Sequence, residues 1–319
     1  MSQRLPPLTA LRAFEAASRH MSFAKAADEL NVTPAALSYQ IKSLEADLGT
    51  PLFRRLNRAV ELTEAGRALS PGTRDAFSVL TAAWHNAVRM VDTAVLNVTA
   101  GPAFTSKWLA PRLFSFAQAH PEIELRFHAS LRIADFDRDD VDVAIRFGMG
   151  EDKDVYSRPL IKEWLTPMMN PETAARIKTP ADLAQMTLVH DESVAGFTVP
   201  SDWNTWCKAA NVALDTEHGP RFSQADHALD AAMEGAGVTL GRVSLAARAL
   251  ESGRLVAPFD VGIIAEPRFR FICPIGHEVR PNVAAFEAWI LKELEATKRF
   301  EIGRKLVQSR DVLAGEAPT

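Results

Sequence analysis

The sequence predicts a multidomain α+β protein, with a small helical domain, one long helix and a larger α/β region. Three patterns support this fold class. The first sixty residues have apolar side chains at helical spacing, and a long helical pattern follows from residue 63. From residue 94 onward, strand-like stretches alternate with helical ones. We therefore expect domains over residues 1–62, 63–92 and 93–319.

The composition and charge distribution exclude several classes of protein. The chain has 319 residues, of which 47% are hydrophobic and 24% charged, so global disorder is excluded. No apolar run approaches the ~18 residues that a membrane span needs. Charged residues interrupt the first twenty positions, so no signal-peptide core is expected there. Cytoplasm is the expected compartment, without a membrane partner.

Net charge differs between the two ends of the chain. The total of −4 argues against a strongly basic nucleic-acid binder. Residues 1–92, however, contain 11 Lys and Arg against 9 Asp and Glu, which gives +2. The remaining residues contain 25 against 31, which gives −6. The acidity belongs to the C-terminal region, so partners must be inferred separately for each region.

Three short helices are expected at the N-terminus. Apolar residues recur at helical spacing over Leu8–Ala17, and Ser22 can cap a second helix. Asn31 tolerates the left-handed backbone of a tight turn. Thr33 can cap a third helix, with Pro34 at its first position, where the missing N–H is harmless.

Two short helices joined by a tight turn fit a helix-turn-helix motif. That motif needs small residues where the helices cross, met by Ala26 and Ala27, and it places Val32 and Leu37 in the core. The outer face of the second helix would then reach base edges, and the basic stretch over residues 52–62 would form a hairpin wing. On spacing alone, three helices that pack together without DNA remain an equal alternative.

The candidate DNA contacts share exposure on this helix, its cap or the wing. Hydroxyls can hydrogen-bond bases or phosphates, cations can neutralise phosphates, and alanine can touch a thymine methyl. The set is Ser22, Thr33, Pro34, Ala35, Ser38, Tyr39, Lys42, Arg54, Arg55 and Arg58.

A helical pattern then runs from Thr63 to about Val91. Pro71-Gly72 interrupts it, which predicts a kink or a local break. From Val95 onward, three strand-like stretches and a helical stretch over Ser106–His120 indicate βαβ units. About 225 residues of this pattern suit two lobes better than one sheet.

An ordered set of short motifs resembles the LysR-type transcriptional regulators of bacteria. The motifs include Leu11-Arg12-Ala13-Phe14, Ser22-Phe23-Ala24-Lys25-Ala26-Ala27, Val32-Thr33-Pro34-Ala35-Ala36-Leu37-Ser38, Leu52-Phe53-Arg54-Arg55 and Leu62-Thr63-Glu64-Ala65-Gly66. The segment Lys107-Trp108-Leu109-Ala110-Pro111-Arg112-Leu113 resembles the subgroup that contains the glycine-cleavage activator and the β-lactamase regulator. Many members have Gln-Pro where this chain has Pro34-Ala35, and Arg where it has Tyr39, so base contacts are not transferred at those positions.

The resemblance implies a winged helix-turn-helix, a linker helix that dimerises, and a two-lobed effector domain like a periplasmic solute-binding protein. One lobe is expected over about residues 93–163 and 268–300, and the other over about 164–267. The expected partners are double-stranded promoter DNA, a small-molecule effector, further copies of the chain in a homodimer or homotetramer, and RNA polymerase. No cofactor is expected.

Most candidate effector contacts lie where predicted strands end, and the last three lie where a helix of the second lobe begins and could close on a ligand from the opposite side. Phe104, Thr105, Ser106 and Lys107 open a helix after the first strand, and free N–H groups there suit an anion, although a simple N-cap is the alternative. The other candidates are Ser130, Asp135, Arg146, Phe147, Ser223, Gln224 and His227. Asp135 could pair with an amine or cap a helix. Arg146 could bind a carboxylate or pair with Asp140, and Ser223 could be a helix cap.

Together these groups suggest an amino-acid-like effector. No nucleotide-binding loop, nucleophile motif or metal-ligand spacing is present, and Cys207 and Cys273 are interpreted as buried thiols. We therefore expect no enzyme and no metal site. The alternative is a cytoplasmic solute-binding receptor or enzyme in which the N-terminal helices serve assembly.

Overall fold

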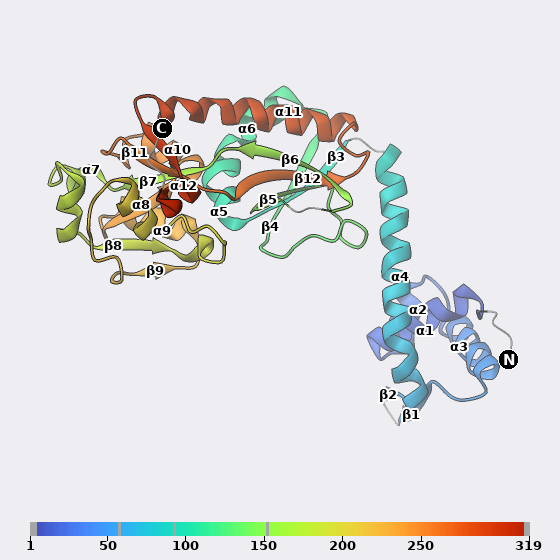
Figure 1. Cartoon of the computed structure of the whole chain (residues 1–319). Helices are drawn as coiled ribbons and strands as arrows, with labels where there is room; N and C mark the ends of the chain where they lie inside the picture. The colour runs from blue at the N-terminus through green and yellow to red at the C-terminus, as the bar shows by residue number, and fades with distance from the viewer. Residues whose placement is uncertain (1–4, 57–58, 92–93, 151–152, 316–319) are drawn as a thin grey trace. The chain divides into compact units, whose positions relative to one another are not determined.

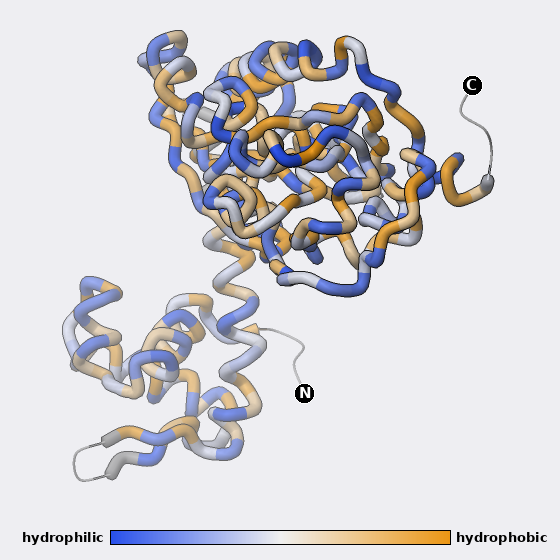
Figure 2. The backbone as a smooth tube through the Cα atoms, turned by 90° about the vertical axis from the view of Figure 1, so that its left-hand side faces the viewer, coloured by the Kyte–Doolittle hydropathy of each residue, from blue (hydrophilic) through white to orange (hydrophobic). Residues whose placement is uncertain are grey.

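The computed structural model describes residues 5–56, 59–91, 94–150 and 153–315. The chain divides into two compact units, residues 1–89 and 90–319. Figure 1 shows the order of helices and strands in each unit. Within the described residues, no helix is long and apolar enough to cross a membrane. Figure 2 shows hydrophobic and hydrophilic residues alternating over short stretches of the backbone in both units.

The N-terminal unit contains three helices, a hairpin and the start of a long helix. Its elements are α1 (Leu8–His20), α2 (Phe23–Glu29), α3 (Pro34–Leu48), β1 (Phe53–Leu56), β2 (Ala59–Leu62) and α4 (Glu64–Val91). The two strands pair antiparallel, with Phe53 opposite Leu62. This arrangement of helix, turn, helix and hairpin confirms the predicted winged helix-turn-helix.

The core of this unit forms where the helices cross. Ala26 and Ala27 of α2 are fully buried, so α1 and α3 can approach α2 closely. Leu37 of α3 is 1% exposed, as expected, but Val32 is 43% exposed, and its predicted burial is wrong. The turn is held by the Val32 amide, which donates to Ala27 O at 3.0 Å, so the side chain is not needed to fix it.

Helix α4 runs through Pro71 without a break. Proline removes the amide that would donate to the carbonyl one turn earlier. The hydroxyl of Thr73 donates to the carbonyls of Leu69 and Ser70 at 3.1 and 3.0 Å, which adds bonds beside the proline. Of the two predicted alternatives, the local break is therefore wrong, and the kink stays a prediction.

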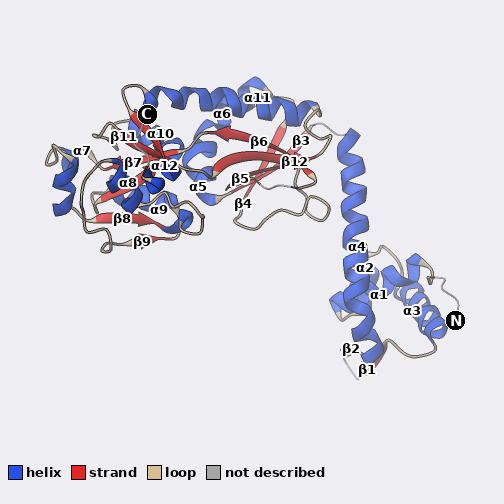
Figure 3. Ribbon diagram, in the orientation of Figure 1, coloured by secondary structure: helices blue, strands red, loops and turns tan. Residues whose placement is uncertain are grey.

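The C-terminal unit contains two sheets. The first has the order β4-β3-β5-β12-β6 and combines parallel and antiparallel pairs. Its strands are β3 (Val95–Ala100), β4 (Glu124–Ala129), β5 (Val143–Gly148), β6 (Val155–Ile161) and β12 (Arg268–Pro274). Figure 3 shows this sheet with α11 (Pro281–Glu295) beside it, and a buried cluster joins the two.

The second sheet has the order β13-β11-β7-β10-β8-β9. Its strands are β7 (Trp164–Met168), β8 (Leu188–Asp191), β9 (Arg221–Phe222), β10 (Val238–Arg242), β11 (Val261–Ile264) and β13 (Lys305–Gln308). The chain passes from the first sheet to the second between β6 and β7, and returns between β11 and β12. The C-terminal strand β13 closes one edge of the second sheet, where the sequence pattern assigned no strand.

Short helices connect and cover these strands. They are α5 (Pro102–Phe104), the π-helix η1 (Thr105–Leu109), η2 (Ala110–Arg112), α6 (Leu113–Ala119), α7 (Pro171–Ala174), η3 (Pro180–Gln185), η4 (Glu192–Val194), α8 (Trp203–Ala209), α9 (Ala225–Met233), α10 (Val243–Glu251), η5 (Ala296–Glu301) and α12 (Ser309–Ala314). We call the part built on the first sheet lobe I and the part built on the second lobe II.

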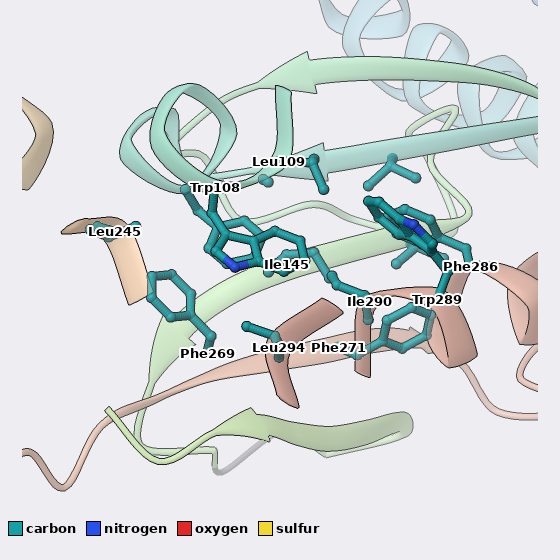
Figure 4. Packing of buried hydrophobic residues seen from close by; sticks show 14 of the residues in the cluster. Trp108, Leu109, Ile145, Leu245, Phe269, Phe271, Phe286, Trp289, Ile290 and Leu294 are labelled. Atoms are coloured by element: carbon teal, nitrogen blue, oxygen red, sulfur yellow. The ribbon is translucent and has the colours of Figure 1, made fainter. Parts of the chain in front are cut away.

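One buried hydrophobic cluster extends across both lobes, and lobe II has a further cluster of its own. Trp108 of η1 and Phe269 of β12 belong to lobe I, and Leu245 of α10 belongs to lobe II, yet all three belong to one buried cluster. Figure 4 shows Trp108 near Leu245 and Phe269, with Phe286 and Trp289 of α11 deeper in lobe I. The lobes are thus joined by packing as well as by three chain crossings, since the chain also passes from α11 of lobe I to β13 of lobe II.

Candidate functional site

The turn between α2 and α3 is fixed by local hydrogen bonds. The Lys25 amide donates to Ser22 Oγ at 3.4 Å, and the Ala36 amide donates to Thr33 Oγ1 at 3.1 Å, so both predicted caps are present. Asn31 has φ 52°, in the left-handed region that asparagine tolerates. The Ser22 bond fixes the start of α2, and the Thr33 bond fixes the start of α3 after the turn.

Helix α3 has one buried face and one exposed face. Leu37, Ile41 and Leu44 are at most 2% exposed. On the other side, Thr33, Pro34, Ala35, Tyr39 and Lys42 are exposed and Ser38 is half-buried. Tyr39 is 71% exposed, and neither its hydroxyl nor the Lys42 ammonium has a bonding partner among the described residues.

The hairpin is attached to α3 by a residue that the sequence reasoning did not single out. Glu45 Oε1 accepts hydrogen bonds from the amides of Leu52 and Phe53, at 2.8 and 3.2 Å. Arg54 on β1 is exposed. Arg58 and the side chain of Arg55 lie outside the described residues, so the wing contacts predicted there stay predictions.

An ion-pair network joins the end of α1 to the end of α2. Arg19 pairs with Glu15 at 2.9 Å and with Glu29 at 2.6 Å, and His20 lies 2.5 Å from Glu29. The hydrogen bond from Arg19, followed by that from His20, lowers the pKa of Glu29 from 4.5 to about 2. The network therefore stabilises the α1–α2 crossing when Glu29 is ionised.

A cavity of about 400 Å³ lies between the two lobes of the C-terminal unit. Lobe I contributes the ends of β3 and β5 and the loop after β4, while lobe II contributes η4, the segment after it and the end of β10. Ligands of open α/β sheets bind at such strand ends. Among the predicted effector contacts, Phe104, Ser130, Arg146, Phe147 and Gln224 line the cavity.

The helix after β3 begins earlier than the sequence suggested. Its first residue is Pro102, which proline's fixed φ favours, so Thr105 lies inside the helical region. The Thr105 amide donates to Gly101 O at 2.9 Å, and its hydroxyl donates to the same oxygen at 3.0 Å. The expected free N–H groups at Thr105 are therefore absent, and Gly101 and Pro102 line the cavity instead.

Ser106 and Lys107 connect the lobes rather than line the cavity. Ser106 Oγ donates to Asp226 Oδ2 at 3.0 Å, and Lys107 Nζ lies 2.5 Å from Asp230 Oδ1. Both acceptors belong to α9 of lobe II. These two contacts hold one lobe against the other, a role that more than 100 residues of sequence separation concealed.

Three other predicted residues lie away from the cavity lining. The carboxylate of Asp135 accepts from the Asp137 amide and pairs with Arg138 at 3.6 Å. Ser223 and His227 are exposed, and Ser223 does not cap α9, whose N-cap residue is Gln224.

Arg146 does not pair with Asp140, which was one predicted alternative. Its guanidinium donates to Thr99 Oγ1 and Arg132 O, both at 3.0 Å, and to Ile145 O at 2.9 Å. Burial, followed by repulsion from Arg132, lowers the pKa of Arg146.

Lobe II supplies lining residues that sequence reasoning missed, including Arg242, Ser193 and Phe197. Arg242 Nη2 lies 3.1 Å from Asp191 Oδ2, and the guanidinium lies 4.7 Å from the centre of the Phe147 ring in lobe I. Arg242 is the last residue of β10, and Arg146 lies two residues before the end of β5, so a place near a strand end is the one signal that could have identified Arg242.

The two cysteines are buried, as expected. Burial raises the pKa of Cys207 to about 11 and that of Cys273 to about 12, so both stay protonated and unreactive near neutral pH. Within the described ranges, no group of three or more His, Cys, Asp or Glu residues could hold a metal ion.

Two family models match the chain. Residues 8–67 match the bacterial regulatory helix-turn-helix protein of the lysR family, and residues 91–295 match the LysR substrate binding domain. The two matches cover the helix-turn-helix and the two-lobed unit in turn.

Individual relatives agree with the family models. The glycine cleavage system transcriptional activator of Escherichia coli K12 is 41% identical over 300 residues, which cover 93% of this chain and 96% of the relative. The transcriptional activator AmpR of Citrobacter koseri is 35% identical over 286 residues, covering 90% and 98%. The effector domain of AmpR from Pseudomonas aeruginosa superimposes with a TM-score of 0.53 at 32% identity, over 65% of this chain and all of that domain.

The exposed face of α3, the cavity between two lobes and these matches lead to one assignment. The chain has the DNA-binding motif and the effector-binding domain of its relatives in the same order and at similar length. It belongs to the LysR family of bacterial transcriptional regulators.

Proposed function

We propose that this regulator reads promoter DNA with the exposed face of α3 and changes its DNA binding when a small molecule occupies the cavity between the lobes. The observation that carries the proposal is the two-sided character of α3. Leu37, Ile41 and Leu44 anchor one face in the core, while Tyr39 and Lys42 on the other face have no bonding partner among the described residues. A helix held in this way can enter a major groove without rearrangement.

Oligomerisation is part of the proposal. Two copies of α3 spaced by a dimer would bind a dyad-symmetric site, and a homodimer or homotetramer would supply that spacing. On α4, Leu80 and Trp84 are 51% and 69% exposed and lie one turn apart, which supports pairing of this helix with a second copy. Promoter binding also implies a cytoplasmic, non-enzymatic protein. Two relatives are named activators, which supports contact with RNA polymerase.

Ligand control would follow from the two-lobed unit. A molecule that contacts both lobes stabilises one degree of closure over another only through a difference in affinity. The Ser106–Asp226 and Lys107–Asp230 contacts join the lobes without a ligand. They therefore stabilise the ligand-free degree of closure that an effector would have to change.

A gel-shift titration with promoter DNA tests the DNA-binding part. The double variant Ser38→Ala with Tyr39→Ala should weaken binding by about tenfold or more, because two base- or phosphate-bonding hydroxyls are removed. A matched control, Glu172→Ala with Arg176→Ala, removes an exposed ion pair between α7 and the segment after it, and should bind like the wild type. Equal affinity of the first variant and the wild type would refute the role of α3.

A further inference from the structure

The described residues that line the effector cavity carry positive but no negative charge. Arg146, Arg242 and Arg270 all line it, and no Asp or Glu occurs among the described lining residues. Arg146 and Arg242 differ in how their charge is balanced, and this difference indicates what the cavity can bind.

The charge of Arg242 is balanced within the protein. Its side chain is 4% exposed, and Asp191, which is 6% exposed, lies 3.1 Å away. Ser193 Oγ accepts a second bond from the same nitrogen at 2.8 Å. Arg242 therefore behaves as a fixed part of the cavity wall, and it holds Phe147 of the opposite lobe under its guanidinium.

Arg146 is held by hydrogen bonds as Arg242 is, but its positive charge is not balanced by any described carboxylate. Its three hydrogen-bond acceptors are two backbone carbonyls and the Thr99 hydroxyl, all of them neutral. Among the described residues no carboxylate lies within ion-pair distance. The side chain is half-buried, and a half-buried cation without a counterion is unfavourable unless a partner is supplied. The fold thus orients the Arg146 guanidinium, and a bound ligand would supply the negative charge that pairs with it.

The remaining walls are apolar. Phe104 and Phe269 are nearly fully buried, and Phe147 and Phe197 meet edge to face across the lobes with ring centres 5.7 Å apart. At the rim, Leu131 and Ile133 are 66% and 84% exposed. Exposed aliphatic side chains at the mouth of a cavity gain stability when a ligand covers them.

We propose that the cavity binds a small organic anion, a carboxylate or phosphate monoester carried on an apolar body, with Arg146 as the residue that pairs with the anionic group. This rests on the proposed function of the cavity as the effector site. It also revises the amino-acid-like expectation, because Asp135, the predicted partner for an amine, is not among the lining residues. A guanidinium forms charge-assisted hydrogen bonds with carboxylate and phosphate, which a neutral amide does not match.

Isothermal titration calorimetry on the full-length protein tests the proposal with four probes. Benzoate and phenyl phosphate carry the two kinds of anion on the same ring, benzamide is the neutral counterpart of benzoate, and phenylalanine adds an amine. Each is small enough for a cavity of about 400 Å³. We expect at least one of the two anions to bind, and the tighter one identifies the preferred group. Benzamide should not bind measurably, and phenylalanine should bind more weakly than the preferred anion.

Variants assign the binding to Arg146. Arg146→Gln should weaken the preferred anion about tenfold to a hundredfold, because a charge-assisted hydrogen-bonded pair is lost. Arg146→Lys keeps the positive charge but lacks the planar guanidinium, so its affinity for the anion should lie between those of Arg146→Gln and the wild type. Arg126→Gln, which removes an exposed arginine from β4, is the control and should bind like the wild type. Circular dichroism checks that each variant is folded.

Any one of three results would overturn the inference. Neither anion binds, benzoate and benzamide bind equally well, or Arg146→Gln binds the anion as tightly as the wild type. Promoter binding, measured by gel shift on the same preparation, distinguishes a failure of the proposed ligand class from a failure of the proposed function. Retained DNA binding without anion binding refutes only the ligand class, whereas loss of DNA binding by the wild type refutes the proposed function itself.

Discussion

The exposed face of α3 and the cavity between the lobes are built in opposite ways. On α3, the candidate contacts Tyr39 and Lys42 project outward and bond to no described residue, so the fold of the N-terminal unit does not depend on them. In the cavity, Arg146 and Arg242 are bonded within the lobes that they line. The difference implies that DNA contacts can change at little cost in stability, whereas changes in the effector unit alter stability and function together.

The largest expected effect concerns a buried ion pair in the effector unit. Arg280 Nη1 lies 2.8 Å from Asp142 Oδ1, and the side chains are 6% and 0% exposed. Arg280→Gln leaves a fully buried carboxylate without this cation, so the free energy of unfolding of the C-terminal unit should fall by about 3–5 kcal/mol. Chemical denaturation followed by tryptophan fluorescence measures the loss.

The matched control for this prediction is Arg126→Gln, which removes an arginine whose partner Glu124 is 61% exposed. An exposed pair contributes about 0–1 kcal/mol, so the control should unfold almost like the wild type. If both variants lost the same small amount, the contrast between the buried and the exposed surface would be wrong.

A smaller effect is expected at the turn before α3. Thr33→Ala removes the hydroxyl that accepts from the Ala36 amide, and it should lower the free energy of unfolding of the N-terminal unit by about 1 kcal/mol. Thr33→Ser keeps the cap and should retain nearly all of the stability. A loss in the serine variant as large as in the alanine variant would show that the hydroxyl does not cap α3.

The ion-pair network between α1 and α2 predicts a modest dependence on pH. Because the folded pKa of Glu29 is lowered from 4.5 to about 2, its contribution is complete above pH 4.5 and is lost as the pH falls toward 2. The effect should be small, since the Glu29 side chain is 39% exposed. Thermal unfolding between pH 2 and 6 should show a shallower decline for Glu29→Gln. An identical decline in both proteins would exclude a role for this carboxylate.

Local signals explain why the N-terminal unit was largely predictable. Ser22, Thr33 and Asn31 act on amides within a few residues of themselves, so the caps and the turn follow from neighbouring residue types. Val32 is the exception. A pattern of residue types identified the turn but did not show that its backbone amide, rather than its side chain, holds it.

The cavity was less predictable because its walls come from distant segments. Strand ends, where ligands of such sheets bind, pointed to Ser130, Arg146 and Phe147, and all three line the cavity. Nothing near Lys107 in the sequence indicates that its partner is Asp230, 123 residues away. Arg242 and Phe197 were missed for the same reason, because their position depends on how lobe II packs against lobe I.

The central claim is that the exposed residues of α3 contact DNA but do not stabilise the fold. It is tested most directly by selecting bound fragments from sheared genomic DNA. The wild-type protein should enrich a discrete set of fragments that share a dyad-symmetric motif. The variant Ser38→Ala with Tyr39→Ala should enrich none of them, while its free energy of unfolding stays within about 0.5 kcal/mol of the wild type. Enrichment of the same fragments by both proteins would contradict the account.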